Sequence, residues 1–318
     1  MKLERVAPII QSKKVGKTNE LWEKMKEQKY LFLLMAPGII YFLIFKYGPL
    51  YGLMLAFKDF DASAGIIGSP WAGLKYFKRF IEMESVWKVV INTLRISLLK
   101  IIFGFPAPII FALLLNEIRL EKFKKGVQTI SYLPHFLSWI VISGLVINIL
   151  SPSTGLYGYI CNILGINAGV PLGDTSTFLW VVIISNIWKE IGYGSIIYLA
   201  AISGIGMEMY EAAKIDGANR FKQCLYITFP SLLPTVSIMF ILGLGNVLDA
   251  GFDQVFNLYT PLVYPVADIL DTYIYRVGLG DFQYSFATAV GLTKNIVAFT
   301  LVMSCNWVVR KFSDYSIW

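Results

Sequence analysis

Long apolar segments alternate with short polar ones along most of the chain. A helix needs about 20 mainly apolar residues to cross the hydrocarbon part of a bilayer, and six segments meet or approach this length. The pattern predicts an all-α integral membrane protein with six transmembrane helices. The expected spans are residues 30–57, 87–116, 127–150, 178–203, 231–250 and 285–307.

The polar segments between the expected spans differ in charge. Residues 58–86, 151–177 and 251–284 together carry five Lys or Arg, whereas the N-terminal tail, the other two connections and the C-terminal end together carry 17. Basic residues gather on the cytoplasmic side of membrane proteins, so both ends of the chain are expected in the cytoplasm. We expect residues 1–29 to be a basic cytoplasmic tail beside anionic lipid, and residues 30–318 to form the transmembrane domain.

Composition narrows the class of protein further. Hydrophobic residues make up 56% of the 318 residues and charged residues 15%, whereas soluble domains carry about 25% charged residues. The net charge of +7 is spread between apolar runs, which argues against nucleic-acid binding. The three cysteines lack the spacing of a disulfide framework or a metal site, and the single histidine, His135, leaves little room for histidine-based catalysis.

The fourth expected span is the least uniform. Its middle holds Trp188-Lys189-Glu190, and Gly192 and Gly194 follow. A charge inside a membrane is costly unless it faces protein or water. We expect an interruption of the helix here.

Residues 207–230 form a short polar unit between the fourth and fifth spans. Asp216-Gly217 breaks it in the middle, because glycine readily takes the left-handed conformation that ends a helix. A second helix can restart over 218–226, and Pro230 closes the unit at a position that suits the first turn of the next helix. Two short helices projecting from the membrane into water would offer a surface to a soluble partner.

This unit resembles the EAA loop of permease subunits in bacterial ATP-binding-cassette importers. The resemblance rests on Glu211-Ala212-Ala213, Asp216-Gly217-Ala218, Ile227 and Pro230 at matching spacing. It implies the MetI-like fold of type I importers, in which the loop is a cytoplasmic coupling helix that lies in a groove of an ATPase subunit. The implied coupling residues are Glu211, Ala212, Ala213, Asp216, Gly217, Ala218, Arg220 and Pro230.

Further motifs extend the resemblance over most of residues 30–318. They look like those of carbohydrate-uptake permeases for oligosaccharides, and of the LplB-like polysaccharide branch in particular. The motifs are Lys46-Tyr47-Gly48-Pro49, Ser69-Pro70-Trp71, Trp188-Lys189, Tyr198-Leu199-Ala200-Ala201 and Tyr210-Glu211-Ala212-Ala213. The resemblance implies a second, related permease as partner, forming a heterodimer in a bacterial plasma membrane.

The chain contains no Walker A pattern, so it is not expected to be an enzyme or to hold a cofactor or metal of its own. ATP and Mg would be bound by two separate ATPase subunits. The segments expected outside the membrane are too short for a full solute-capture domain, which together with the resemblance implies a separate extracellular solute-binding lipoprotein.

Two sets of side chains are expected to carry the transport chemistry. Glu211 suits a charge-assisted contact with a basic residue of the ATPase, and the alternative is an intrachain pair with Lys214 or Lys222. Aromatic and planar polar groups within the spans suit sugars, although each could instead join two helices by a hydrogen bond. The path candidates are Asn186, Trp188, Tyr193, Tyr198, Asn246 and Asp249.

Other classes of function remain open at this point. An ion-coupled secondary transporter would use a carboxylate within the membrane, for which Glu190 is the candidate and Asp249 lies further out. An intramembrane enzyme would need a catalytic cluster, and the sequence shows no recognisable one. A related importer for a peptide, amino acid or phosphate would share the polar unit, since that unit does not define the solute.

Overall fold

The computed structural model describes residues 28–244 and 248–312, and apart from one isolated bridge between Lys58 and Trp71 the regular structure in this part is helical. The chain divides into two compact units at Met54. The first unit holds α2 (Lys29–Phe42), a π-helical turn (Leu43–Tyr47) and the start of a 3-10 helix (Gly48–Phe57). Together they give an apolar helical path, Lys29–Phe57, that is long enough to cross a membrane.

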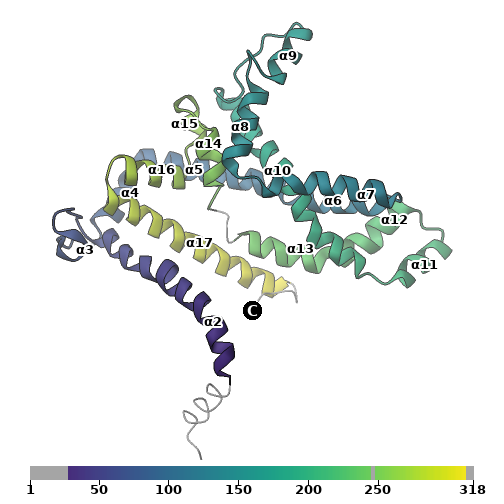
Figure 1. Ribbon diagram of the computed structural model, residues 1–318, viewed down its shortest axis with the longest axis horizontal. Coiled ribbons are helices and arrows are strands. Elements are labelled where there is room, and N and C mark those ends of the chain that lie inside the picture. The colour runs from purple at the N-terminus through teal and green to yellow at the C-terminus, as the bar shows by residue number, and fades with distance from the viewer. Residues whose placement is uncertain (1–27, 245–247, 313–318) are drawn as a thin grey trace, which may run out of the picture. The chain divides into compact units, whose positions relative to one another are not determined.

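The second unit begins at Leu55 and contains the remaining helices (Figure 1). Its elements are α3 (Gly65–Gly68), α4 (Lys75–Glu82), α5 (Glu84–Leu99), α6 (Pro106–Glu117), α7 (Glu121–Tyr132), α8 (Trp139–Leu150), α9 (Leu156–Ile163), α10 (Thr175–Ser203), α11 (Met207–Ile215), α12 (Arg220–Gln223), α13 (Phe229–Leu244), α14 (Phe252–Leu258), α15 (Tyr264–Ala267), α16 (Leu270–Tyr275) and α17 (Tyr284–Phe312).

Helices that are candidates for crossing a membrane account for most of this unit. Three continuous helices are long and apolar enough to span: Glu84–Glu117, Arg220–Gly243 and Tyr284–Ser304. Two further pairs pass the same test only as bent spans, with an angle of 107° between the α7 segment and α8 and of 71° between α10 and α11. With α2 and its extension, the described part of the chain supports four spans, or six if each bent pair counts as one.

The expected third span is not one straight helix. The chain leaves α7 through a 3-10 turn at Leu133–Phe136 and restarts as α8 after Ser138, whose side chain accepts a hydrogen bond from the Val141 amide at 3.4 Å. Pro134 lies in that turn and cannot donate a backbone hydrogen bond, and serine is a favoured residue at a helix start. Pro134 and Ser138 therefore interrupt the helix within an otherwise apolar run.

The interruption expected in the fourth span is absent, because α10 runs unbroken from Thr175 to Ser203. Its two glycines serve close packing. A Cβ at Gly192 would lie 2.1 Å from the Ser131 carbonyl oxygen of α7, and one at Gly194 would lie 3.0 Å from Cγ of Pro108 on α6. The glycines permit α10 to approach both neighbours, which is a second reason for glycine in a membrane helix.

The fifth span begins earlier than expected. Helix α12, a π-helical turn (Cys224–Thr228) and α13 run on as one helix from Arg220 to Gly243. Pro230 therefore does not close the polar unit, although it does lie in the first turn of α13. The π-helical turn ends two residues before Pro230.

Buried apolar side chains form three clusters that hold the second unit together. One joins α4, α5, α16 and α17 around Val86, Tyr273 and Phe286. A second joins α5, α10 and the α14–α16 segment around Phe178 and Val255. The third joins α6, α10 and α13 around Ile109, Tyr198 and Leu232. Most other large apolar side chains are exposed, as expected for helices that face lipid or other subunits.

Candidate functional site

The polar unit folds as two helices separated by a left-handed turn. Helix α11 ends at Ile215, and Gly217 follows with φ +76°. The Ala218 amide donates to the Ala213 carbonyl at 2.8 Å, and the Gly217 amide donates to the Lys214 carbonyl at 3.1 Å. These two bonds form a Schellman motif, which satisfies the last carbonyls of a helix and requires the left-handed residue. The predicted break at 216–217 is confirmed.

Side-chain bonds stabilise the start of the second helix and join the segment that follows it to the first helix. The Asn219 side chain accepts from the Lys222 amide at 2.9 Å and so caps the start of α12. The hydroxyls of Tyr210 and Thr228 lie 2.9 Å apart, and Nε2 of Gln223 donates to the Ala218 carbonyl at 2.8 Å. The unit is therefore a defined structural element and not an irregular loop.

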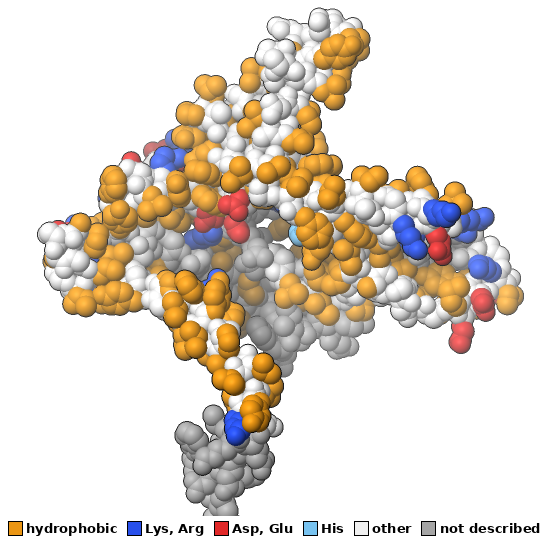
Figure 2. Space-filling view, viewed as in Figure 1, with side chains coloured by type: hydrophobic (Ala, Val, Ile, Leu, Met, Phe, Trp, Pro, Cys, Tyr) orange, Lys and Arg blue, Asp and Glu red, His pale blue; other side chains and the backbone are white. Residues whose placement is uncertain are grey.

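The predicted coupling residues are mostly accessible. Ala213 and Ala218 are half-buried, whereas the other six are exposed. Glu211 forms no ion pair within the described residues, so the intrachain pair with Lys214 or Lys222 is not formed there. Figure 2 shows Lys, Arg and acidic side chains gathered where α7, α11 and α12 lie.

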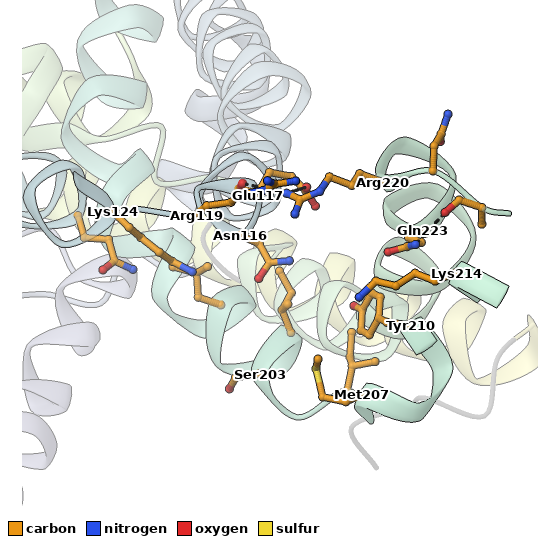
Figure 3. Close-up of a pocket in the computed structure, with 16 residues that line it drawn as sticks. Asn116, Glu117, Arg119, Lys124, Ser203, Met207, Tyr210, Lys214, Arg220 and Gln223 are labelled. Atoms are coloured by element: carbon orange, nitrogen blue, oxygen red, sulfur yellow. Dashed lines mark hydrogen bonds and ion pairs between the residues drawn. The ribbon is translucent and has the colours of Figure 1, made fainter. Parts of the chain in front are cut away.

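An open groove of about 900 Å³ lies between this unit and the ends of α6, α7 and α10 (Figure 3). Arg119, Lys124, Lys214 and Arg220 line it together with one acidic residue, Glu117, so the charged side chains of the groove are mostly basic. Arg220 reaches across the groove, and its Nη1 lies 3.3 Å from Oε2 of Glu117 at the end of α6. This ion pair links the polar unit to the helix Glu84–Glu117, a partner for Arg220 that sequence reasoning missed.

The path candidates differ in how far they are buried. Trp188 and Tyr193 are 44% and 45% exposed, Asn186 is half-buried beside Gly104, and Asp249 is exposed. Tyr198 is only 3% exposed and packs among Ile109, Ala112 and Leu232, so its ring belongs to the bundle core in this conformation. Asn246 lies outside the described residues.

A charged cluster joins α10 to the bend before α8. His135 stacks on Tyr193 with ring centroids 3.8 Å apart, and its Nδ1 lies 2.8 Å from Oε2 of Glu190. Lys189 is 6% exposed, and its ammonium donates to the carbonyls of His135 and Leu137 at 2.6 and 2.9 Å. The single histidine was visible in the sequence, but its partners come from a helix more than 50 residues away.

No three His, Cys, Asp or Glu side chains of the described residues come together in a way that could hold a metal ion.

Comparison with known proteins identifies the family. The family described as binding-protein-dependent transport system inner membrane component matches residues 104–312. Protein LplB of Bacillus subtilis (strain 168) is 39% identical, covering 98% of this chain and 97% of that protein. The polygalacturonan/rhamnogalacturonan transport system permease protein YteP of the same organism is 40% identical, covering 99% of each.

Solved structures agree with the sequence relatives. A chain in the crystal structure of a bacterial ABC transporter involved in the import of the acidic polysaccharide alginate superposes with a TM-score of 0.85 at 40% identity, covering 92% of this chain and 99% of that chain. A second crystal structure of a bacterial alginate ABC transporter, in complex with alginate pentasaccharide-bound periplasmic protein, also gives 0.85. The helical fold, the membrane spans and these matches place the chain in the family of binding-protein-dependent transport system inner membrane components.

Proposed function

We propose that this chain is the membrane-spanning permease subunit of an ATP-driven importer, and that its cargo is an oligosaccharide. The cargo is proposed from two relatives of about 40% identity that are named for polysaccharide transport. Among the residues of the chain itself, Glu211 on α11 carries the proposal, because it is exposed and forms no ion pair within residues 28–244 and 248–312, which leaves a charged contact open for a second protein.

The α11–α12 unit is the coupling element in this proposal. Its position next to α10 and its continuity with the helix Arg220–Gly243 would let movement of an attached ATPase pass into two spans at once. The Glu117–Arg220 pair extends the same connection to a third span. The unit and the chain ends then lie in the cytoplasm, and the predicted basic tail, residues 1–29, falls almost wholly outside the described residues.

Partner subunits complete the transporter. Two ATPase subunits bind ATP and Mg and drive the cycle, while this chain holds neither. A second, related permease forms the other wall of the solute path, and an extracellular solute-binding lipoprotein delivers the sugar. The solved alginate transporter in complex with a periplasmic protein supports an assembly of this kind.

The test reverses one charge on α11 and compares it with a matched reversal. Glu211→Arg should lower both ATPase association with the permease pair and solute uptake at least about tenfold, which is the scale of one charged hydrogen bond. Glu208→Arg, on the same helix, makes the same charge change and should have little effect. Normal coupling in the Glu211 variant would refute the proposed role of α11.

A second measurement addresses ion-coupled transport. Glu190, the carboxylate that such a transporter would use, lies 2.8 Å from Nδ1 of His135, a pair of the kind that relays protons in ion-coupled transporters. Under ATP-driven import, uptake should stop when ATP is depleted and should survive an uncoupler while ATP is maintained. The opposite result would favour a secondary transporter.

A further inference from the structure

The groove beside the coupling unit lies where three membrane helices end. The candidate span Glu84–Glu117 ends at the groove, the candidate span Arg220–Gly243 begins there, and Ser203, the last residue of α10, also lines it. The apolar part of a span fills the hydrocarbon layer, so the polar residues at its end lie at the depth of the lipid headgroups. The groove therefore faces the headgroup layer, and under the charge-based orientation this is the cytoplasmic leaflet.

The groove carries more positive charge than its own carboxylate can balance. Arg220 is paired with Glu117, whereas Arg119 and Lys124 on one side and Lys214 on the other have no carboxylate within ion-pair distance in residues 28–244 and 248–312 (Figure 3). Like charges that share one groove repel each other, and a bound anion removes that repulsion. These three side chains therefore favour an anionic ligand.

An apolar stripe continues from the groove toward the middle of the membrane. Leu114 and Ile110 precede Glu117 on α6 by one and two helical turns and lie on the same face of the helix. Their side chains are 62% and 55% exposed. A phospholipid places a phosphate above acyl chains, which matches a basic groove above an exposed apolar helix face. Basic pockets between membrane helices on the cytoplasmic side are a pattern by which anionic lipid headgroups are recognised.

We propose that this groove binds the phosphate of an anionic phospholipid such as phosphatidylglycerol. Arg119 and Lys124 contact the phosphate oxygens from the α6–α7 side, and Lys214 contacts them from α11, by charge-assisted hydrogen bonds. One lipid then bridges the coupling unit and the end of a membrane span. The inference goes beyond the proposed function, because it requires neither the sugar cargo nor the contact with the ATPase.

The experiment uses native mass spectrometry to measure lipid binding to the purified permease–ATPase complex in detergent. Phosphatidylcholine with the same acyl chains is the comparison, because it carries the phosphate without a net charge. Wild type should bind phosphatidylglycerol at least about tenfold more tightly. The double variant Arg119→Gln with Lys124→Gln should weaken phosphatidylglycerol binding about 30-fold, at about fivefold for each cation, and should leave phosphatidylcholine binding unchanged. Both replaced residues lie outside the coupling unit.

The double variant Lys122→Gln with Lys125→Gln is the matched control. Both lysines are exposed on α7 and neither lines the groove, so the variant loses the same charge next to the site. Its affinity for phosphatidylglycerol should equal that of wild type. An equal thermal unfolding midpoint of wild type and both double variants in phosphatidylcholine verifies that the fold is kept.

Four results would overturn the inference. Equal weakening in the two double variants shows a general attraction of lipid to positive charge, and unchanged binding in the Arg119 and Lys124 variant excludes the groove. Displacement of the lipid by an equal concentration of glycerol 1-phosphate assigns the groove to a soluble phosphate compound. Lower ATPase association in the groove variant with unchanged lipid binding assigns it to a protein contact. ATP-dependent uptake by wild type in bilayers of phosphatidylcholine alone would leave the proposed function standing in each case.

Discussion

The ammonium of Lys189 lies 2.6 Å from the carbonyl oxygen of His135, and this bond joins the middle of α10 to the bend between α7 and α8. The same ammonium reaches the Leu137 carbonyl at 2.9 Å and the Pro134 carbonyl at 3.4 Å. A sharp bend in a membrane helix leaves carbonyls without partners, and these must be satisfied within the protein. Lys189 satisfies them, so α10 and the broken third span are mechanically connected.

Removal of this ammonium should destabilise the protein. In Lys189→Met the three carbonyls lose their common donor while the chain length of the residue is kept, and we expect a loss of about 1–3 kcal/mol. The measurement is the thermal unfolding midpoint in detergent. Lys88→Met is the control, because the side chain of Lys88 is 72% exposed and its nearest carboxylate is 3.9 Å away. Equal midpoints for the two variants would contradict the role assigned to Lys189.

The contact between α7 and α10 allows no side chain at Gly192. A Cβ there would lie 2.1 Å from the Ser131 carbonyl oxygen and 2.4 Å from its carbon, both backbone atoms that cannot move aside. Gly192→Ala should therefore separate the helices and lower the unfolding midpoint. In Gly126→Ala on α7 the new methyl group meets no atom within 4 Å. The midpoint should stay unchanged or rise, because alanine is favoured over glycine in a helix by up to about 1 kcal/mol. A Gly192 variant as stable as the Gly126 variant would show that the helices do not pack this closely.

The turn of the coupling unit requires glycine at position 217 for its backbone conformation and not for close packing. Gly217 has φ +76°, and a Cβ at this position would have no atom within 4 Å. A side chain there would therefore strain the backbone but would cause no steric clash. Gly217→Ala should cost about 1–2 kcal/mol locally and Gly217→Asn less, since asparagine tolerates this conformation. Faster hydrogen exchange of the Ala218 amide would report the loosened turn. Gly206→Ala, at φ −59°, serves as control and should leave this exchange rate unchanged.

Local sequence chemistry was sufficient to predict this turn and the membrane class. The Asp216-Gly217 break and the spans 30–57 and 285–307 follow from hydropathy and from the conformational freedom of glycine. The break at 133–138 was missed, although Pro134 and Ser138 carry its signal, because an apolar run dominates a window of span length. Helix breakers must therefore be weighed within a span as well as between spans.

Contacts between residues far apart in the chain could not be predicted from the sequence. Gly192 and Gly194 predicted an interruption of α10 because glycine weakens an isolated helix, but neighbouring helices occupy the space that they leave. Likewise the pairs Arg220–Glu117 and His135–Glu190 join residues 103 and 55 positions apart, which no local pattern reveals.

The segment that leads to α4 should respond to acid. Hydrogen bonds from Lys75 and then Tyr76 lower the pKa of Asp59 below its ordinary value of 3.8, against a smaller opposing effect of burial. A lowered carboxyl pKa contributes stability that is present above the ordinary pKa and is lost as the pH falls through the lowered one. Hydrogen exchange of the Asp59 amide, which donates to the Pro70 carbonyl, should be faster in Asp59→Asn than in wild type at pH 7. The ratio between the two should approach one well below pH 3.8. A ratio that does not change with pH would show that the carboxylate charge does not hold this segment.

The ion pair across the groove predicts that uptake needs opposite charges at positions 117 and 220, and that it matters less which of the two carries the positive charge. Arg220 and Glu117 lie 3.3 Å apart with side chains 53% and 40% exposed, so the pair contributes less than about 1 kcal/mol. Glu117→Arg alone places a second guanidinium opposite Arg220 in a groove already lined by Arg119 and Lys124, and should impair uptake. The double variant Glu117→Arg with Arg220→Glu restores one pair at the same place and should recover uptake relative to either single reversal. Lys222→Glu reverses a charge on the same short helix without lining the groove, and combined with Glu117→Arg it should give no recovery. If the double reversal is no better than the single ones, Arg220 acts on a partner protein and not through Glu117.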